Sequence, residues 1–143
     1  MFVKSFSKYV PGEHSVKAAF AFFCALSLTW LLTVPFYSDY SEDKGDVTVV
    51  IDNFENKEGS YMAKSGDHHV FIDSGQLRFQ MYRVCLHEFA HYRMSGKNLT
   101  VDEQHNRMHK SLFLSYDPRC NMILTQPPFF LSKIFTYFQQ FMC

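Results

Sequence analysis

The segment HEFAH (residues 87–91) has the residue types and the spacing of a metal-assisted hydrolytic site. On a helix, residues four apart lie on the same face, so His87 and His91 can offer imidazole nitrogens to one ion. Zinc held by three protein ligands keeps a position for water and lowers the pKa of that water to about 7. Glu88, beside the ion, can take the proton of the water and pass it to a leaving amine. The motif therefore indicates peptide hydrolysis with two ligands and a general base.

Such a zinc site needs a third protein ligand, and the segment DEQHNRMHKSLF (102–113) offers several. If two helices run antiparallel about a turn near residues 97–98, the positions opposite the two histidines fall near 104–108. The candidates are Asp102, Glu103, His105 and His109. We predict His105, with Asp102 as the next candidate. Glu103 has a competing role in a helix cap, and His109 lies one turn farther along the helix.

Two predicted helices position these residues. Residues 76–94 contain no Gly or Pro, and their apolar residues recur at helical spacing, which predicts one long helix with a wide apolar face. Gly96 follows as a C-terminal stop signal. The sequence TVDE then has the pattern of a capping box with Thr100 as N-cap, and it predicts a second helix from Val101 to about Ser115.

Strands are predicted before the two helices. They are rich in β-branched and other apolar residues, and turn signals separate them. The predicted strands cover residues 46–54, 61–64 and 68–75, with turns at 56–60 and 65–67. We therefore expect an α+β fold, in which residues 46–126 form a small domain with a short β-sheet, the HEFAH helix and a second ligand-bearing helix.

The segment VCLHEFAHY (84–92), after strands and before a second helix, resembles the zincin metallopeptidases. It is most similar to their smallest members, such as SprT-like and ImmA-like domains, and the resemblance covers about residues 46–115. It implies that His87 and His91 are zinc ligands and that Glu88 is the general base.

The same resemblance bears on the third ligand and on the substrate. In SprT-like domains a His is followed by a small residue and later by a Phe, which would select His105. Minimal gluzincins carry an acidic residue in an E-x-x-A-D pattern that DEQHN echoes, which would select Asp102. The resemblance also implies that an upstream strand, about 68–74, borders the cleft and pairs with an extended substrate. Arg93 departs from the pattern, because zincins usually have a hydrophobic residue there. No H-E-x-x-H-x-x-G-x-x-H sequence occurs, which excludes the metzincin group.

The N-terminal segment predicts a membrane anchor. No residue over 18–37 is charged, and twenty helical residues span about 30 Å, the thickness of the hydrocarbon core of a bilayer. We expect the anchor to stay uncleaved, because residues 1–17 are long for a signal peptide and no small-x-small cleavage site follows. Lysines precede the span and acidic residues follow it. Residues 1–17 are therefore expected in the cytoplasm, and the catalytic domain on the periplasmic or extracellular side.

Two other segments and the cysteines complete the predicted organisation. Residues 38–45 are polar and are predicted to be a linker. Residues 127–143 begin with two prolines and carry aromatic residues at helical spacing, which predicts an amphipathic helix that packs on the domain or lies on the membrane surface. The four cysteines do not form a disulfide framework. Cys85 and Cys120 can pair in an oxidising compartment, but their spacing leaves this open.

The expected function is that of a membrane-anchored zinc metallopeptidase acting on a peptide or protein substrate. The chain has 14 basic and 14 acidic residues, and this lack of a basic excess argues against a nucleic-acid partner. Two alternatives stay open: a zincin-like domain that binds metal or protein without turnover, and a small structural membrane protein with a chance HEFAH. Tyr92 or Tyr116 can polarise a substrate carbonyl, and His68 and His69 can approach the cleft.

Overall fold

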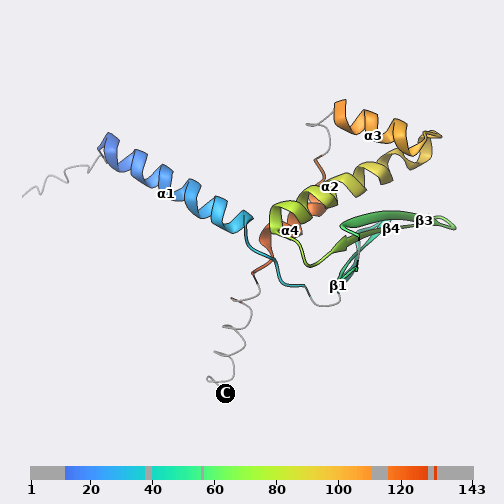
Figure 1. The fold of residues 1–143 in the computed structure, drawn as a ribbon, viewed down its shortest axis with the longest axis horizontal. Helices are drawn as coiled ribbons and strands as arrows, with labels where there is room; N and C mark the ends of the chain where they lie inside the picture. Colours follow the sequence, from blue (N-terminus) through green and yellow to red (C-terminus); the bar gives the residue numbers. More distant parts are fainter. Residues whose placement is uncertain (1–11, 38–39, 56, 111–115, 129–130, 132–143) are drawn as a thin grey trace, which may run out of the picture. The chain divides into compact units, whose positions relative to one another are not determined.

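The computed structural model shows an α+β fold (Figure 1) and describes residues 12–37, 40–55, 57–110, 116–128 and 131. The chain divides into two compact units, Met1–Trp30 and Leu31–Cys143. Helix α1 (Glu13–Leu31) lies almost entirely in the first unit. The described elements of the second unit are β1 (Tyr40–Asp43), β2 (Val47–Asp52), β3 (Gly59–Lys64), β4 (Asp67–Asp73), α2 (Arg78–Met94), η1 (Ser95–Lys97), α3 (Val101–Lys110), η2 (Pro118–Cys120) and α4 (Asn121–Thr125).

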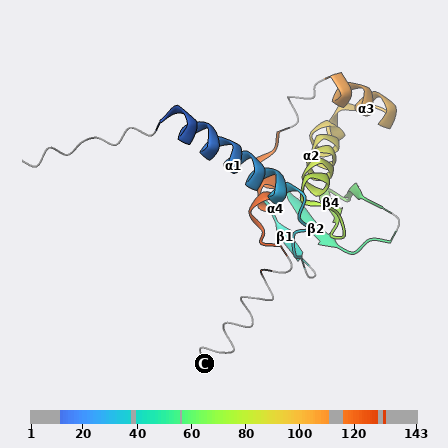
Figure 2. The same ribbon diagram turned by 60° about the vertical axis from the view of Figure 1, so that its left-hand side comes forward.

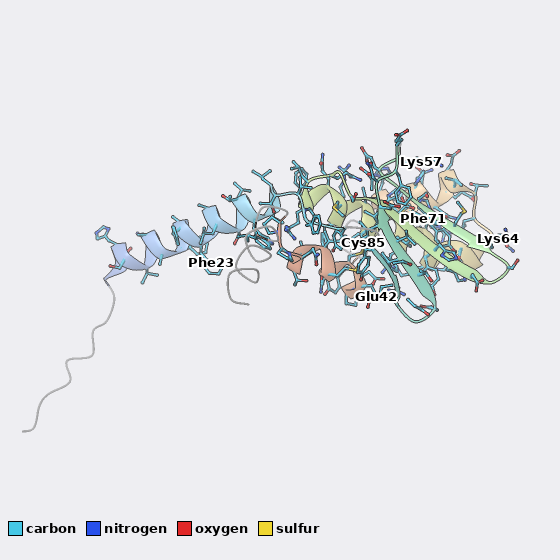
Figure 3. All side chains as sticks on the ribbon, turned by 90° about the horizontal axis from the view of Figure 1, so that it is seen from below. Phe23, Glu42, Lys57, Lys64, Phe71 and Cys85 are labelled. Atoms are coloured by element: carbon cyan, nitrogen blue, oxygen red, sulfur yellow. A yellow bond between two sulfur atoms is a disulfide. The ribbon has the colours of Figure 1, made fainter. Side chains whose placement is uncertain are left out.

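Helix α1 is long and apolar enough to cross a membrane. Its 19 residues cover about 29 Å at a rise of 1.5 Å per residue. None of its residues is buried within the described structure. Phe23, which projects from the outside of the helix in Figure 3, is 72% exposed. An apolar surface of this kind is expected of a helix whose solvent is lipid.

The bounds of α1 differ from the predicted span over 18–37. The helix begins earlier, because the carboxylate of Glu13 in its first turn pairs with Lys17 at 2.6 Å. Part of the predicted cytoplasmic segment 1–17 is therefore helical. The helix ends at Leu31, ahead of Pro35, which has no N–H and disfavours the helical conformation in the residue before it.

The strands form one sheet in the order β1-β2-β4-β3. Strands β2 and β4 run parallel, with Val47 opposite His68, and β3 and β4 form an antiparallel hairpin. The predicted turn after β3 is confirmed. Its residues Ser65 and Gly66 have φ of 54° and 90°, and a two-residue turn with both φ positive matches the right-handed twist of the strands.

Strand β1 corrects the prediction of a linker over 38–45. Tyr40–Asp43 pairs with β2 in antiparallel register, from Tyr40 opposite Ile51 to Asp43 opposite Thr48. Its polar sequence is compatible with a strand because an edge strand needs mainly backbone hydrogen bonds to its neighbour. Gly45, with φ of 91°, lies in the turn that returns the chain to β2.

The hydrophobic core lies between the sheet and helix α2. Alternate residues of β2 and β4 point toward the helix, as the period of two in a strand requires. Helix α2 contacts both β3 and β4, and it confirms the predicted long helix. The buried core residues are Val47, Val49, Ile51, Val70, Ile72, Met81, Val84, Cys85, Phe89, Cys120 and Ile123.

Helix α3 lies against α2 after the short η1 segment (Figures 1 and 2). It confirms the predicted second helix and its cap. The N–H of Thr100 donates to Glu103 Oε2 at 2.8 Å, and the N–H of Glu103 donates to Thr100 Oγ1 at 3.3 Å. The predicted continuation over 111–115 lies outside the described residues.

The chain after α4 returns to the segment that follows α1. Pro35 and Pro128 form an isolated antiparallel bridge, and the N–H of Phe36 donates to the carbonyl of Pro127 at 3.1 Å. The amide of Gln126 donates to the carbonyl of Phe36 at 2.6 Å. The helix predicted over 127–143 lies, apart from its first two residues and Leu131, outside the described residues.

Cys85 in α2 and Cys120 in η2 form a disulfide with a Cα–Cα distance of 5.9 Å. The sequence alone left this pairing open. The bond joins the middle of α2 to the segment that contains α4, and both cysteines lie in the core. The disulfide therefore fixes the helix that carries HEFAH to a segment 35 residues later.

Asp117, only 3% exposed, is the centre of an ion-pair cluster. Its carboxylate accepts from the Arg119 guanidinium at 2.8 Å and pairs with Arg93 at 3.4 Å. Burial raises the pKa of Asp117, but the hydrogen bonds from Arg119 and the charges of both arginines outweigh it, so the net direction is downward. This cluster gives Arg93, where zincins usually have a hydrophobic residue, a role in holding η2 to α2.

We predict that replacing Cys85 and Cys120 together with Ser lowers the free energy of unfolding by about 2–4 kcal/mol. Loss of the cross-link frees a long loop in the unfolded chain, and the chain-entropy model gives about 4 kcal/mol for a loop of this length. Urea unfolding of the full chain in detergent, followed by circular dichroism, measures the change. The Cys24→Ser variant is the control, since Cys24 is a free cysteine in α1. Equal stability of the double variant and the control would contradict the prediction.

We predict that Asp117→Asn destabilises the domain by about 2 kcal/mol near pH 7, because Asn keeps the side-chain acceptor but removes the charge. The pKa of Asp117 is lower in the folded than in the unfolded state. Its contribution is therefore present above the unfolded pKa and is lost as the pH falls through the folded pKa. Urea unfolding of both proteins should show their difference shrinking below about pH 4. A difference that stays constant down to pH 3 would show that the charge is not responsible.

Candidate metal centre

Three imidazole nitrogens converge between α2 and α3. The Nε2 atom of His91 lies 3.2 Å from Nε2 of His87 and 3.1 Å from Nε2 of His105. The ligand atoms of all three residues lie within 4.8 Å of one another. A tetrahedral zinc ion with Zn–N bonds of about 2.0–2.1 Å separates its ligand nitrogens by about 3.3–3.4 Å. The histidine triad (His87, His91 and His105) therefore has nearly the spacing that one shared ion requires.

The hydrogen bonds of Gln104 select the tautomer of His91. Its amide nitrogen donates to the carbonyl of Leu99 at 3.2 Å, so its oxygen Oε1 faces Nδ1 of His91 at 2.7 Å. An amide oxygen only accepts, so Nδ1 of His91 carries the proton and Nε2 keeps its lone pair. A lone pair directed at the other two imidazoles is what a metal ligand needs.

The pKa of His87 is lowered to about 4. Desolvation is the main cause, and the positive charges of the neighbouring histidines and of Arg83 add to it. His87 is therefore neutral at pH 7, the form in which imidazole binds a metal.

The structure separates the four candidates for the third ligand. His105 joins the histidine triad, whereas Asp102 is exposed and lies outside it. Glu103 is held in the cap of α3 by Thr100, as the capping pattern predicts. His109, one turn beyond His105, lines the neighbouring groove but does not belong to the triad. The difference follows from the helical rotation of α3, in which positions 104, 105 and 108 are half-buried while 102, 103 and 109 are exposed.

Glu88 lies beside the triad but takes no part in it. Its side chain is only 7% exposed, and burial raises its pKa, although the charge of His91 and a hydrogen bond from the backbone of Tyr61 oppose the shift. The carboxylate is thus more basic than an exposed one. This position suits a group that exchanges a proton with a molecule bound at the triad.

Strand β3, rather than residues 68–74, borders the site. The expectation for 68–74 is wrong because β4 is paired on both sides, with β2 and with β3. Gly59, in a segment predicted as a turn, begins β3 and lies directly against α2. A Cβ atom there would approach Val84 Cγ1 to 2.3 Å and Glu88 Cγ to 3.5 Å. Only glycine allows the strand to lie this close to Val84 of α2.

A groove of about 630 Å³ runs between β3, α2 and α3. His87 and His105 of the histidine triad line this groove together with Glu88. Val84 and Leu86 add aliphatic side chains to its lining. It is lined by Glu58, Gly59, Arg83, Val84, Leu86, His87, Glu88, His105, Met108 and His109. An apolar groove with a few convergent polar groups is typical of a binding site for a substrate segment.

The other predicted polar residues have structural contacts outside this groove. Tyr61 hydroxyl lies 2.6 Å from Nδ1 of His68, and Tyr92 donates to Asp46. Tyr116 accepts from the amide of Asn121 at 2.9 Å. None of the candidates His68, His69, Tyr92 and Tyr116 lines the groove. Sequence reasoning missed Gln104 and Gly59, because neither residue type marks a metal or a cleft without its spatial neighbours.

Comparison with protein-family models, with curated proteins and with solved structures found no match for this chain. The resemblance to zincins therefore rests on the HEFAH segment of the sequence.

We predict that Gln104→Leu weakens zinc binding by about 10- to 100-fold, because His91 loses the acceptor that fixes its tautomer and ring orientation. Gln104→Glu keeps an acceptor at the same place and should retain or strengthen binding. Asp102→Asn, on the exposed side of the same helix, is the matched control and should bind zinc normally. Competition with a fluorescent chelator at pH 7 gives the affinities. Wild-type affinity in Gln104→Leu would refute the role of this amide.

Proposed function

We propose that the chain is a membrane-anchored, zinc-dependent peptidase with His87, His91 and His105 as metal ligands and Glu88 as the general base. The observation that carries the proposal is the pairing of the histidine triad with a buried carboxylate that is not part of it. A site that only binds metal has no need of such a carboxylate. The HEFAH segment thus combines ligands and base on adjacent faces of α2.

Zinc bound at the triad supplies a Lewis acid and lowers the pKa of a water molecule to about 7. Glu88 would accept a proton from this water as the water oxygen bonds to the peptide carbonyl carbon, and would donate the proton to the amine nitrogen as the C–N bond breaks. The raised pKa of Glu88 favours its acceptance of a proton from the water. It does not prevent the later donation of this proton to the amine. Strand β3, at the edge of the sheet, offers backbone groups with which an extended peptide can pair in the groove.

Zinc is the metal that we propose, because three imidazole nitrogens at nearly tetrahedral spacing match its preferences. Iron and nickel also accept imidazole ligands, and metal analysis of the purified protein distinguishes them.

Two observations support a location of the domain outside the cytoplasm. Helix α1 is long and apolar enough to anchor the chain, and the residues before it are basic while those after it are acidic. The disulfide Cys85–Cys120 is a bond that persists in oxidising compartments, such as the periplasm or the cell exterior.

We predict that Glu88→Gln keeps about one zinc per chain and loses peptidase activity by at least about 100-fold. His87→Ala should lose both the metal and the activity, because a ligand is removed. Metal content of the full chain in detergent is measured by elemental analysis, and cleavage of denatured casein by mass spectrometry. Equal cleavage by wild type and Glu88→Gln would reject the mechanism. Metal binding without any Glu88-dependent cleavage would favour a domain that binds metal without turnover.

A further inference from the structure

The first residue of α2 is hydrogen-bonded to Thr33, in the short segment that follows α1. The N–H of Arg78 donates to the carbonyl of Thr33 at 2.8 Å, two residues after Leu31. Its guanidinium, fully buried, donates to Thr33 Oγ1 at 3.2 and 3.3 Å and to the carbonyl of Ile123. Only Leu32 separates Thr33 from the last residue of α1. Within the second unit, the segment that follows α1 is therefore fixed to the helix that carries HEFAH.

The following residues are fastened as well. Pro35 and Phe36 pair with the chain at Pro127 and Pro128, and Gln126 adds a side-chain hydrogen bond to Phe36. Residues 33–36 therefore belong to the folded domain rather than to a spacer. A spacer would let the site move away from its anchor by about 3.3 Å per extended residue.

The length of α2 sets how far the site can lie from the anchor. Ten residues separate Arg78 from Glu88, which is about 15 Å at the helical rise. The hydrogen-bonded contact to Thr33 and the two residues back to Leu31 add roughly 10 Å. Glu88 in the wall of the groove thus lies within about 25 Å of Leu31, which belongs to the same unit.

Apolar side chains are exposed at this same end of the domain. Leu32, Val34 and Phe79 are 53%, 40% and 42% exposed, and they flank the contact between Thr33 and Arg78. Exposed apolar groups next to an apolar helix gain free energy when they enter the interface of the bilayer. We expect lipid to cover the surface formed by Leu32, Val34 and Phe79, because two of these residues closely follow the apolar helix α1 in the chain.

We infer that the groove acts on proteins held in the same membrane, at peptide bonds within about 25 Å of the bilayer, or about eight extended residues. The inference rests on the proposed peptidase function and on α1 as the membrane anchor. Confinement to one membrane raises the effective concentration of such substrates, whereas a site this close to the lipid excludes bonds displayed farther out.

The test uses the full chain in phosphatidylcholine–phosphatidylglycerol vesicles with a membrane-anchored reporter. The reporter has one apolar helix and an unstructured stalk that repeats a single short block, chosen from a casein segment whose cleavage depends on Glu88. Because every block has the same sequence, differences in cleavage between blocks depend only on their distance from the membrane. Mass spectrometry of the products shows which blocks are cut. We expect cuts within about eight residues of the membrane, and cleavage about 100-fold faster than for the same stalk without its anchor.

A spacer variant provides the matched control. Four EAAAK repeats inserted between Trp30 and Leu31, at the boundary of the two units, should move the cuts outward by about 30 Å. Cleavage of soluble casein should stay unchanged, since the insertion leaves the contacts of the domain intact.

The outcomes separate the two proposals. Cuts spread evenly along the stalk, cuts that the spacer does not move, or equal rates on anchored and soluble stalks would overturn the reach inference while leaving the peptidase function in place. Absence of Glu88-dependent cleavage of casein and of both stalks would overturn the proposed function and, with it, this inference.

Discussion

The way in which α2 divides its surface between the sheet and α3 is the constraint on which the site depends. With 3.6 residues per turn, Cys85 and Phe89 fall on the stripe that the sheet buries, while His87 and His91 fall on another face. Glu88 lies between the two, at the boundary with β3. A single rotation of the helix thus buries the carboxylate and leaves the imidazoles facing the groove and α3. With another rotation of α2 about its axis, Glu88 would not be buried against β3 while His87 and His91 face the groove and α3.

Helix α2 is held against that rotation along its whole length. Arg78 fixes its first turn, the disulfide of Cys85 fixes its middle, and Arg93 joins its last turn to Asp117. These contacts reach segments before the sheet and after α3. They hold α2 in the rotation that brings His87 and His91 together with His105, an arrangement that could hold a metal ion.

Two neighbouring residues of helix α3, Gln104 and His105, contact different nitrogens of the His91 ring. Asn98, with φ of 48°, and the short η1 segment reverse the chain, and the cap at Thr100 sets where the helix begins. Gln104 then meets Nδ1 of His91, and His105 meets Nε2 of the same ring. Both ring nitrogens of His91 thereby contact consecutive residues of α3.

The sequence alone could predict the features of this protein that depend on residues close together in the chain. The period of apolar residues predicted α2, the capping pattern predicted the start of α3, and the spacing of His87 and His91 placed both on one face, because each property depends on residues within a turn or two. The polar strand β1, the position of β3 at the sheet edge, and the pairing of Cys85 with Cys120 came only from the tertiary structure. The sequence predicted His105 but left Asp102, Glu103 and His109 open, and only the tertiary structure brings His105 together with His87 and His91. Strand order, helix rotation and the approach of distant residues follow from how the whole core packs, and no short window of sequence contains that information.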